Sequence, residues 1–277
     1  MRYLFIICVL FATITLSRAQ DRIFAYTYQT NVLNKGDFDL EFQNTLATGK
    51  VGDYSPYVFG QHLDQRLEFE VGLGKKVQTA FYINSELFNY ADTSSSDLSQ
   101  ELKISFSNEW KWKLSDPVAN KIGFALYEEL EFGGNNIESE TKLIFDKRWQ
   151  KDLLAFNIIG IYEIEKEIER DENNITSAKW EHSSPLELNI GYIHFIKPET
   201  GVGLEVKLNN DIAEEDGWTN AVLFIGPAAH ISIDKFFMNL SVLPQIANLH
   251  KTDAAPGNRD LNNYEAVEVR LLVGYSF

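Results

Sequence analysis

The stretch Glu265-Ala-Val-Glu-Val-Arg-Leu-Leu-Val-Gly-Tyr-Ser-Phe277 indicates the fold most plainly. Apolar or aromatic residues occupy every second position from Val267 to Phe277, and charged residues such as Glu268 and Arg270 lie between them. A period of two is that of a β-strand with two unlike faces. Because a water-soluble sheet and a membrane barrel can both produce it, the rest of the chain must decide between them.

The same alternation recurs along the chain from Phe38 onward, for example over 66–73 and 202–209, whereas helical periodicity is almost absent. We expect about twelve such segments, each near the roughly ten residues of a membrane-barrel strand. Their expected centres lie near residues 42, 66, 81, 106, 127, 143, 158, 189, 205, 225, 240 and 270.

The links between these segments provide an independent test, because outer-membrane barrels alternate short periplasmic turns with longer outer loops. Short links fall at 74–76, 115–117, 150–152, 197–200 and 234–235, and they alternate with long links at 48–57, 87–98, 133–138, 166–182, 210–219 and 247–262. The order begins and ends with a long link, which places both ends of the barrel on the periplasmic side. The sequence therefore predicts an all-β fold, an antiparallel transmembrane up-and-down β-barrel of about 12 strands with short periplasmic turns and longer extracellular loops.

Two segments resist this pattern. Within 122–132, Glu128 falls on the apolar face, where a charge at mid-membrane would cost a few kcal/mol, so either it lies near an interface or a bulge shifts the register. Within 221–228 both faces are apolar and Pro227 removes a donor from the ladder. The pattern alone assigns no register to either segment.

The first residues resemble a cleaved secretory signal, with basic Arg2, an apolar run over 4–12 and small residues at Ser17 and Ala19. We therefore expect a signal peptide at 1–19, an N-terminal periplasmic lead-in at 20–36 and a barrel at 37–277. Cys8, the only cysteine, falls within the signal. Disulfide and thiolate chemistry are thus not expected in the mature chain.

The net charge bears on which classes of partner the chain can bind. The expected signal holds two of the 25 Lys and Arg residues and none of the 40 Asp and Glu residues, so the remainder carries a net charge of −17. Nucleic acid is not an expected partner, because phosphate binding needs clustered positive charge. No His, Asp or Glu spacing matches a metal site, and we expect no metal or cofactor.

The closing strand, with its aromatic end at Tyr275 and Phe277, resembles the C-terminal signal by which bacterial outer-membrane β-barrels are recognised for assembly. The resemblance implies a location in the outer membrane of a Gram-negative bacterium, with membrane lipid and the barrel-assembly machinery as partners. Barrels of similar size include channels for nucleosides and acidic oligosaccharides as well as lipid-cleaving enzymes. No feature of the sequence selects one of these families or an oligomeric state.

The polar faces of the segments would line the lumen. Expected lumen-lining charges are Arg66, Glu68, Glu70, Glu101, Lys103, Glu109, Lys111, Glu129, Glu131, Lys142, Asp146, Arg148, Glu163, Glu165, Glu187, Glu205, Lys207, Glu268 and Arg270. Acids are in excess, which would favour cations in a narrow pore. The alternative is that these charges pair with one another and fill the interior.

His230 and Ser232 lie two residues apart, hence on one face of a strand, and outer-membrane acyl hydrolases resemble this arrangement. A base beside a hydroxyl is what nucleophilic catalysis needs. The pair lies next to the short link at 234–235, on the expected periplasmic side, whereas lipid-cleaving barrels work in the outer leaflet. We expect no enzyme, and the hydrolase is an alternative.

Aromatic residues cluster near the expected periplasmic strand ends, as in the girdles of membrane barrels: Trp110, Trp112, Tyr192, Phe195, Phe236, Phe237, Tyr275 and Phe277. The leading hypothesis is a porin-like channel that passes small polar solutes and favours cations. The alternatives are an outer-membrane lipid acyl hydrolase using His230 and Ser232, and a plugged barrel that acts as an anchor or assembly partner.

Overall fold

The computed structural model describes residues 22–50, 60–91, 98–170, 176–213, 217–253 and 255–277, and the expected signal peptide lies outside these ranges. The described chain folds into antiparallel strands: β1 (Phe38–Lys50), β2 (Gly60–Gly72), β3 (Val77–Ala91), β4 (Leu98–Ser115), β5 (Gly123–Phe132), β6 (Asn136–Trp149), β7 (Asp152–Arg170), β8 (Thr176–Ser183), β9 (Leu186–Lys197), β10 (Thr200–Ala213), β11 (Gly217–Ile233), β12 (Phe236–Asn248) and β13 (Val267–Ser276). Among these residues, no helix is long and apolar enough to cross a membrane.

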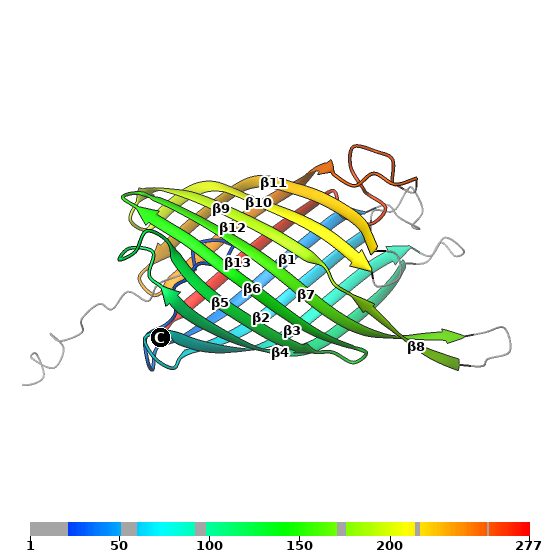
Figure 1. The fold of residues 1–277 in the computed structure, drawn as a ribbon, viewed down its shortest axis with the longest axis horizontal. Coiled ribbons are helices and arrows are strands. Elements are labelled where there is room, and N and C mark those ends of the chain that lie inside the picture. Colours follow the sequence, from blue (N-terminus) through cyan, green and yellow to red (C-terminus); the bar gives the residue numbers. More distant parts are fainter. Residues whose placement is uncertain (1–21, 51–59, 92–97, 171–175, 214–216, 254) are drawn as a thin grey trace, which may run out of the picture.

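The strands close into a barrel, because β1 pairs with both β2 and β13 (Figure 1). Neighbours along the sequence pair in turn around the wall, except that β7 pairs with β9 over its first part and with β8 over its last part. β8 thus continues the crossing that β9 makes, and the β7–β8 hairpin projects beyond the rim (Figure 1). The prediction of a closed up-and-down barrel of about twelve strands is confirmed, with β8 as one extra strand.

The two faces of the wall differ as the alternation predicts. Phe81, Leu102 and Phe106 point outward and are more than half exposed, whereas Glu68 and Glu205 point inward and are fully buried. An apolar outer wall suits lipid, and closure leaves no strand edge unpaired within it. The charged face of each strand therefore forms the lumen.

Short turns gather at one end of the barrel, which we call the short-turn end, and the longer loops lie at the other, the long-loop end (Figure 1). One link departs from the expected order of lengths. The link 116–122 at the short-turn end is longer than both neighbouring links at the long-loop end, 92–97 and 133–135. The parity of the strands, rather than the length of each link, fixes which end a link occupies.

The structure assigns a face to Glu128. The β5–β6 register runs without a shift past Glu128, so the alternative of a bulge at this position is wrong. Its side chain lies on the outer face between Leu126 and Leu130, and it accepts hydrogen bonds from Ser139 Oγ at 2.7 Å and Thr141 Oγ1 at 2.6 Å. Two hydroxyl donors on β6 thus offset part of the cost of a carboxylate on this face.

The two-sided apolar run in β11 also has a defined arrangement. Pro227 pairs with Leu204 of β10, but pairing with β12 is interrupted between Phe224 and Ala228, where a missing donor costs nothing. Val222 and Phe224 point inward and are fully buried. They are apolar because the N-terminal part of the chain packs against them inside the barrel.

Candidate functional site

Residues 22–33, which we call the N-terminal plug, lie within the barrel, whereas the sequence placed them in a periplasmic lead-in of 20–36 (Figure 1). Asn239 near the start of β12 donates to the carbonyl of Arg22 at 2.9 Å, and the N–H of Leu33 donates to Gln78 near the start of β3 at 3.0 Å. Both ends of the plug are therefore at the short-turn end. Between them the chain enters the lumen, and we call its residues 25–27, which lie beside Glu205 of β10, the apex.

The apex is bound by one carboxylate. Glu205 on β10 accepts hydrogen bonds from the N–H groups of Ala25 at 3.3 Å, Tyr26 at 3.0 Å and Thr27 at 2.7 Å. The hydroxyl of Ser241 on β12 donates to the same carboxylate. A plug outside any strand has no ladder to satisfy its backbone, so side chains of the wall must do so.

Further wall side chains bind the returning half of the plug. Asn157 on β7 accepts the N–H of Tyr28 at 2.6 Å and donates to the carbonyl of Tyr28 at 2.9 Å. Asp146 on β6 accepts hydrogen bonds from the Thr30 hydroxyl at 2.7 Å and from the Thr30 N–H at 3.3 Å. The polar residues of the lumen thus recognise the backbone of the plug at defined positions.

Three aromatic residues of the plug occupy three apolar patches on the inner wall. Burial of an aromatic or aliphatic side chain is worth roughly 1.5–3 kcal/mol, so these contacts contribute to the free energy that holds the plug in the lumen. Phe24 packs with Leu153, Ala155, Ile193, Phe195 and Ala228; Tyr26 packs with Val222, Phe224, Leu243 and Tyr264; and Tyr28 packs with Ala125, Tyr127 and Ile144.

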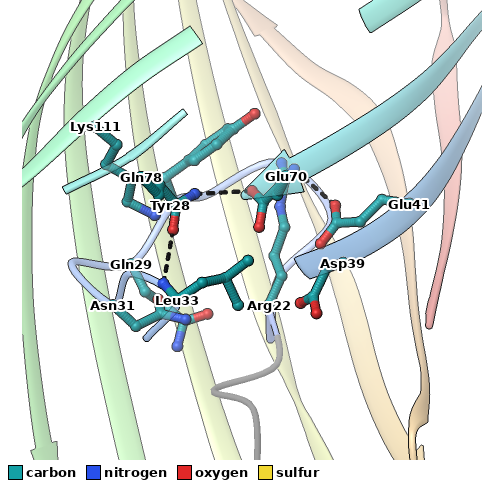
Figure 2. A pocket seen from close by; sticks show the side chains of 10 residues that line it. All are labelled: Arg22, Tyr28, Gln29, Asn31, Leu33, Asp39, Glu41, Glu70, Gln78 and Lys111. Carbon is teal, nitrogen blue, oxygen red and sulfur yellow. Dashed lines mark hydrogen bonds and ion pairs between the residues drawn. The ribbon is translucent and has the colours of Figure 1, made fainter. Parts of the chain in front are cut away.

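Cations of the lumen lie against Tyr28. The Arg22 guanidinium lies 4.0 Å and the Lys142 ammonium 3.9 Å from the centre of its ring. Arg22 also pairs with Glu41 at 3.5 Å (Figure 2). A small cavity next to this cluster is lined by plug and wall residues together, including Glu70 and Lys111 (Figure 2).

The expected lumen-lining charges all lie on inward faces of their strands. Nine of them are buried: Glu68, Glu70, Glu109, Lys111, Glu129, Lys142, Asp146, Glu205 and Glu268. Those that are partly exposed are Arg66, Lys103, Glu131, Glu163, Glu165, Glu187, Lys207 and Arg270. Glu101 and Arg148 lie near opposite ends of the barrel and are exposed.

Several of these charges pair across the lumen. Arg66 on β2 contacts Glu129 on β5, and Lys207 on β10 pairs with Glu268 on β13 at 3.2 Å. Two strands of the wall separate the partners in each pair, so these pairs cross part of the lumen. The plug and these pairs together occupy the lumen from the short-turn end inward.

Toward the long-loop end the lumen is acidic, and we call this part the loop-side lumen. Glu131, Glu138 and Glu163 stand directly opposite one another on β5, β6 and β7. Like charges directly opposite one another in a sheet are destabilising, so the row of Glu131, Glu138 and Glu163 has a cost.

Six further inward acids are absent from the expected lumen-lining charges, although the alternation of their strands places each of them on the inner face: Asp39, Glu41, Asp64, Glu86, Glu138 and Glu140.

Two sets of buried carboxylates have oxygen atoms within 4.8 Å of one another: Asp39, Glu41 and Glu70, and Glu68, Glu70 and Glu109. Hard cations prefer such oxygen ligands. Protein groups already bind parts of both sets, since Arg22 pairs with Glu41 and Gln78 donates to Glu70 at 3.0 Å. Side chains of the chain itself thus supply the positive and donor groups here.

His230 and Ser232 share the inward face of β11, as expected. His230 is buried, and its Nδ1 lies 2.7 Å from Asn239 Oδ1, the side chain whose amide nitrogen binds the carbonyl of Arg22. The partner of this histidine is therefore the support of the plug. The geometry gives a base–hydroxyl pair no support.

The closing strand carries its aromatic end on the outer wall. The ring centres of Tyr275 and Phe277 lie 4.8 Å apart, and Phe277 lies 5.1 Å from Phe38. Phe195 and Phe237, expected in the same girdle, instead point inward and are buried. Phe195 belongs to the patch that receives Phe24.

Comparison with protein families gives one match over most of the chain. The family of unknown function DUF6662 matches residues 16–277. The chain belongs to this family. A comparison with curated proteins gives no match.

Solved structures similar to this member of DUF6662 are outer-membrane barrels. An outer-membrane channel from Pseudomonas putida F1 has a TM-score of 0.62 at 9% identity, covering 90% of this chain and 98% of the channel. The translocator domain of the autotransporter NalP from Neisseria meningitidis has a TM-score of 0.59 at 11% identity, covering 90% and 91%. At such identities the likeness shows the fold alone, and it confirms the resemblance to outer-membrane β-barrels.

Proposed function

We propose that this chain is an outer-membrane channel that passes small polar solutes and favours cations. In this proposal the short turns face the periplasm and the long loops face outward. Membrane lipid covers the apolar wall, and the assembly machinery recognises the closing strand through Tyr275 and Phe277. The similarity to an outer-membrane channel supports the choice of a channel-like barrel.

The row of Glu131, Glu138 and Glu163 carries the proposal. Three carboxylates on adjacent strands repel one another, and packing alone gives no reason to place them together. A ring of inward acids concentrates cations and repels anions. Lys103 pairs with Glu165 at 3.6 Å nearby and neutralises only one further acid.

The way the lumen is filled favours a channel over a solid anchor. Wall side chains are enough to fill the interior of a small barrel of about eight strands, and the interior of a twelve-strand barrel is wider. Here a separate segment without regular secondary structure occupies much of it. Such a segment can leave without breaking the barrel, whereas wall side chains cannot.

The test is a planar bilayer recording with the purified full mature chain under a KCl gradient. We expect discrete conductance steps and a reversal potential of the sign that cation preference requires. A reversal potential of the opposite sign would overturn the cation preference. Absence of steps, both in this protein and in a variant whose plug is shown to be displaced, would overturn the channel and favour the anchor.

A further inference from the structure

We propose that the N-terminal plug is a displaceable gate and that the Glu205 carboxylate is its latch. The inference rests on the proposed channel function and deepens it, because it names the part of the chain that closes the pore and the group that holds it closed. It assigns to Glu205 a regulatory contact in addition to a place in the wall.

The plug is attached to the wall in a way that permits release. Within the described residues, backbone hydrogen bonds from this end of the chain to the wall begin at Gly36, whose N–H donates to the carbonyl of Gly72 at 2.9 Å. The contacts described above between residues 22–33 and the wall are made by wall side chains and by apolar packing. The strands therefore keep their own ladder when the plug leaves, and Gly36 marks the hinge.

Glu205 differs from the other contacts in number and position. Its one carboxylate binds three consecutive N–H groups of the plug, whereas Asn157, Asp146 and Gln78 each contact a single plug residue. It acts at the apex, between the two ends of the plug. Charge-assisted hydrogen bonds in a buried setting are stronger than neutral ones, so neutralising this group weakens the whole apex.

The mature chain expected from the sequence has no cysteine, so a single reporter can be introduced. Thr27→Cys suits this purpose, because Thr27 is fully buried at the apex and its hydroxyl has no hydrogen-bond partner within the described residues. The probe is a water-soluble maleimide added to the folded protein in lipid vesicles. Glu205→Gln is combined with the reporter, and Glu163→Gln, an inward acid remote from the plug, is the matched control.

We expect Glu205→Gln to raise the labelling rate of the reporter at least tenfold, because the amide presents a donor to N–H groups that need an acceptor. Glu163→Gln should leave the rate within twofold of the parent. Migration of unheated samples on a gel and the β-sheet signal in circular dichroism verify that each barrel is folded. Equal labelling in Glu205→Gln and the parent, with both folded, would overturn the latch.

Conductance tests the gate. Glu205→Gln should increase the open fraction in planar bilayers severalfold. In the same variant, Thr30→Cys and Asp146→Cys, whose parent side chains are in contact, are joined into a disulfide by an added thiol oxidant that accepts the two electrons and two protons lost by the thiols. The channel should then stay closed until a thiol reductant is added. Faster labelling with unchanged conductance steps would overturn the gate and leave the channel standing. Faster labelling with no conductance in any variant would overturn the channel itself, so the two failures are distinguishable.

Discussion

Asn157 and Tyr28 exchange two hydrogen bonds, one in each direction, so that a single side-chain amide of the wall pairs with both polar groups of one plug residue. This is the pairing that a neighbouring strand would otherwise provide.

Asn157→Ala should expose the backbone of Tyr28 to exchange. Each buried group left without a partner costs about 1–3 kcal/mol, so amide hydrogen exchange at Tyr28 should accelerate by about tenfold to a hundredfold. Asn189→Ala is the control, because Asn189 is equally buried and stands directly opposite Asn157 in the register. Equal acceleration in both variants would indicate a general loosening of the barrel.

Gly191→Val should displace Phe24 from its patch. A Cβ atom at Gly191 would lie 2.6 Å from Cε1 of the Phe24 ring, closer than packed atoms tolerate. We expect the Thr27→Cys reporter to label severalfold faster, with the barrel still folded. Gly160→Val is the control, since nothing lies within 4 Å of the added carbon, and it should label at the parental rate.

Neutralising the row with Glu131→Gln, Glu138→Gln and Glu163→Gln together should lower the preference for cations. The expected effect is a severalfold fall in the cation-to-anion permeability ratio, measured as a reversal potential closer to zero. Glu128→Gln removes a charge from the outer wall at a nearby level of β5 and should not move the reversal potential. A shift of similar size in both proteins would contradict the assignment of faces.

Glu128→Leu should stabilise the protein in lipid. Removing a carboxylate from the lipid-facing wall should raise the free energy of unfolding by about 1 kcal/mol, since acids cost less there than the ~2–4 kcal/mol of basic residues. Urea unfolding in vesicles provides the measurement. Leu130→Glu, the reverse change on the same face, should lower the free energy, and a gain in both variants would refute the reasoning.

Asp116, in the β4–β5 turn, should titrate at a lower pH than an ordinary aspartate. Its carboxylate accepts hydrogen bonds from Lys113 and from the N–H groups of Ala119 and Val118, which lower its pKa from 3.8 to about 2. Because the folded pKa lies below the unfolded one, its stabilising effect is present above about pH 4 and is lost as the pH falls toward 2. Unfolding midpoints of the parent and Asp116→Asn should therefore differ at pH 6 and converge near pH 2, and a constant difference would contradict this.

The wall could be predicted from the sequence because its information is local. The side chain at every second position meets either lipid or the lumen, so alternation alone places residues such as Glu68, Glu205 and Arg270 on the inner face. The same rule places Glu128 on the outer face. The free-energy cost of a charge on that face was the reason for considering a bulge.

The plug could not be predicted in this way, because its partners are remote. Tyr26 binds a carboxylate at position 205, and short alternation over 22–28 does not specify that contact. A signal was nonetheless present in the wall. Inward apolar residues such as Phe224, Ile193 and Ala125 have no reason to face a water-filled lumen, and their presence in several strands indicated an apolar occupant.

Since the plug enters and leaves at the same end, its response to mechanical load has a direction. A pull on the chain ahead of Arg22 from the short-turn end would separate the contacts one after another, beginning at Asn239 and reaching the apex only later. Peeling of this kind needs far less force than shearing a strand that spans the barrel, where every bond is loaded at once. The fold thus combines a wall that resists force with an occupant that yields to it.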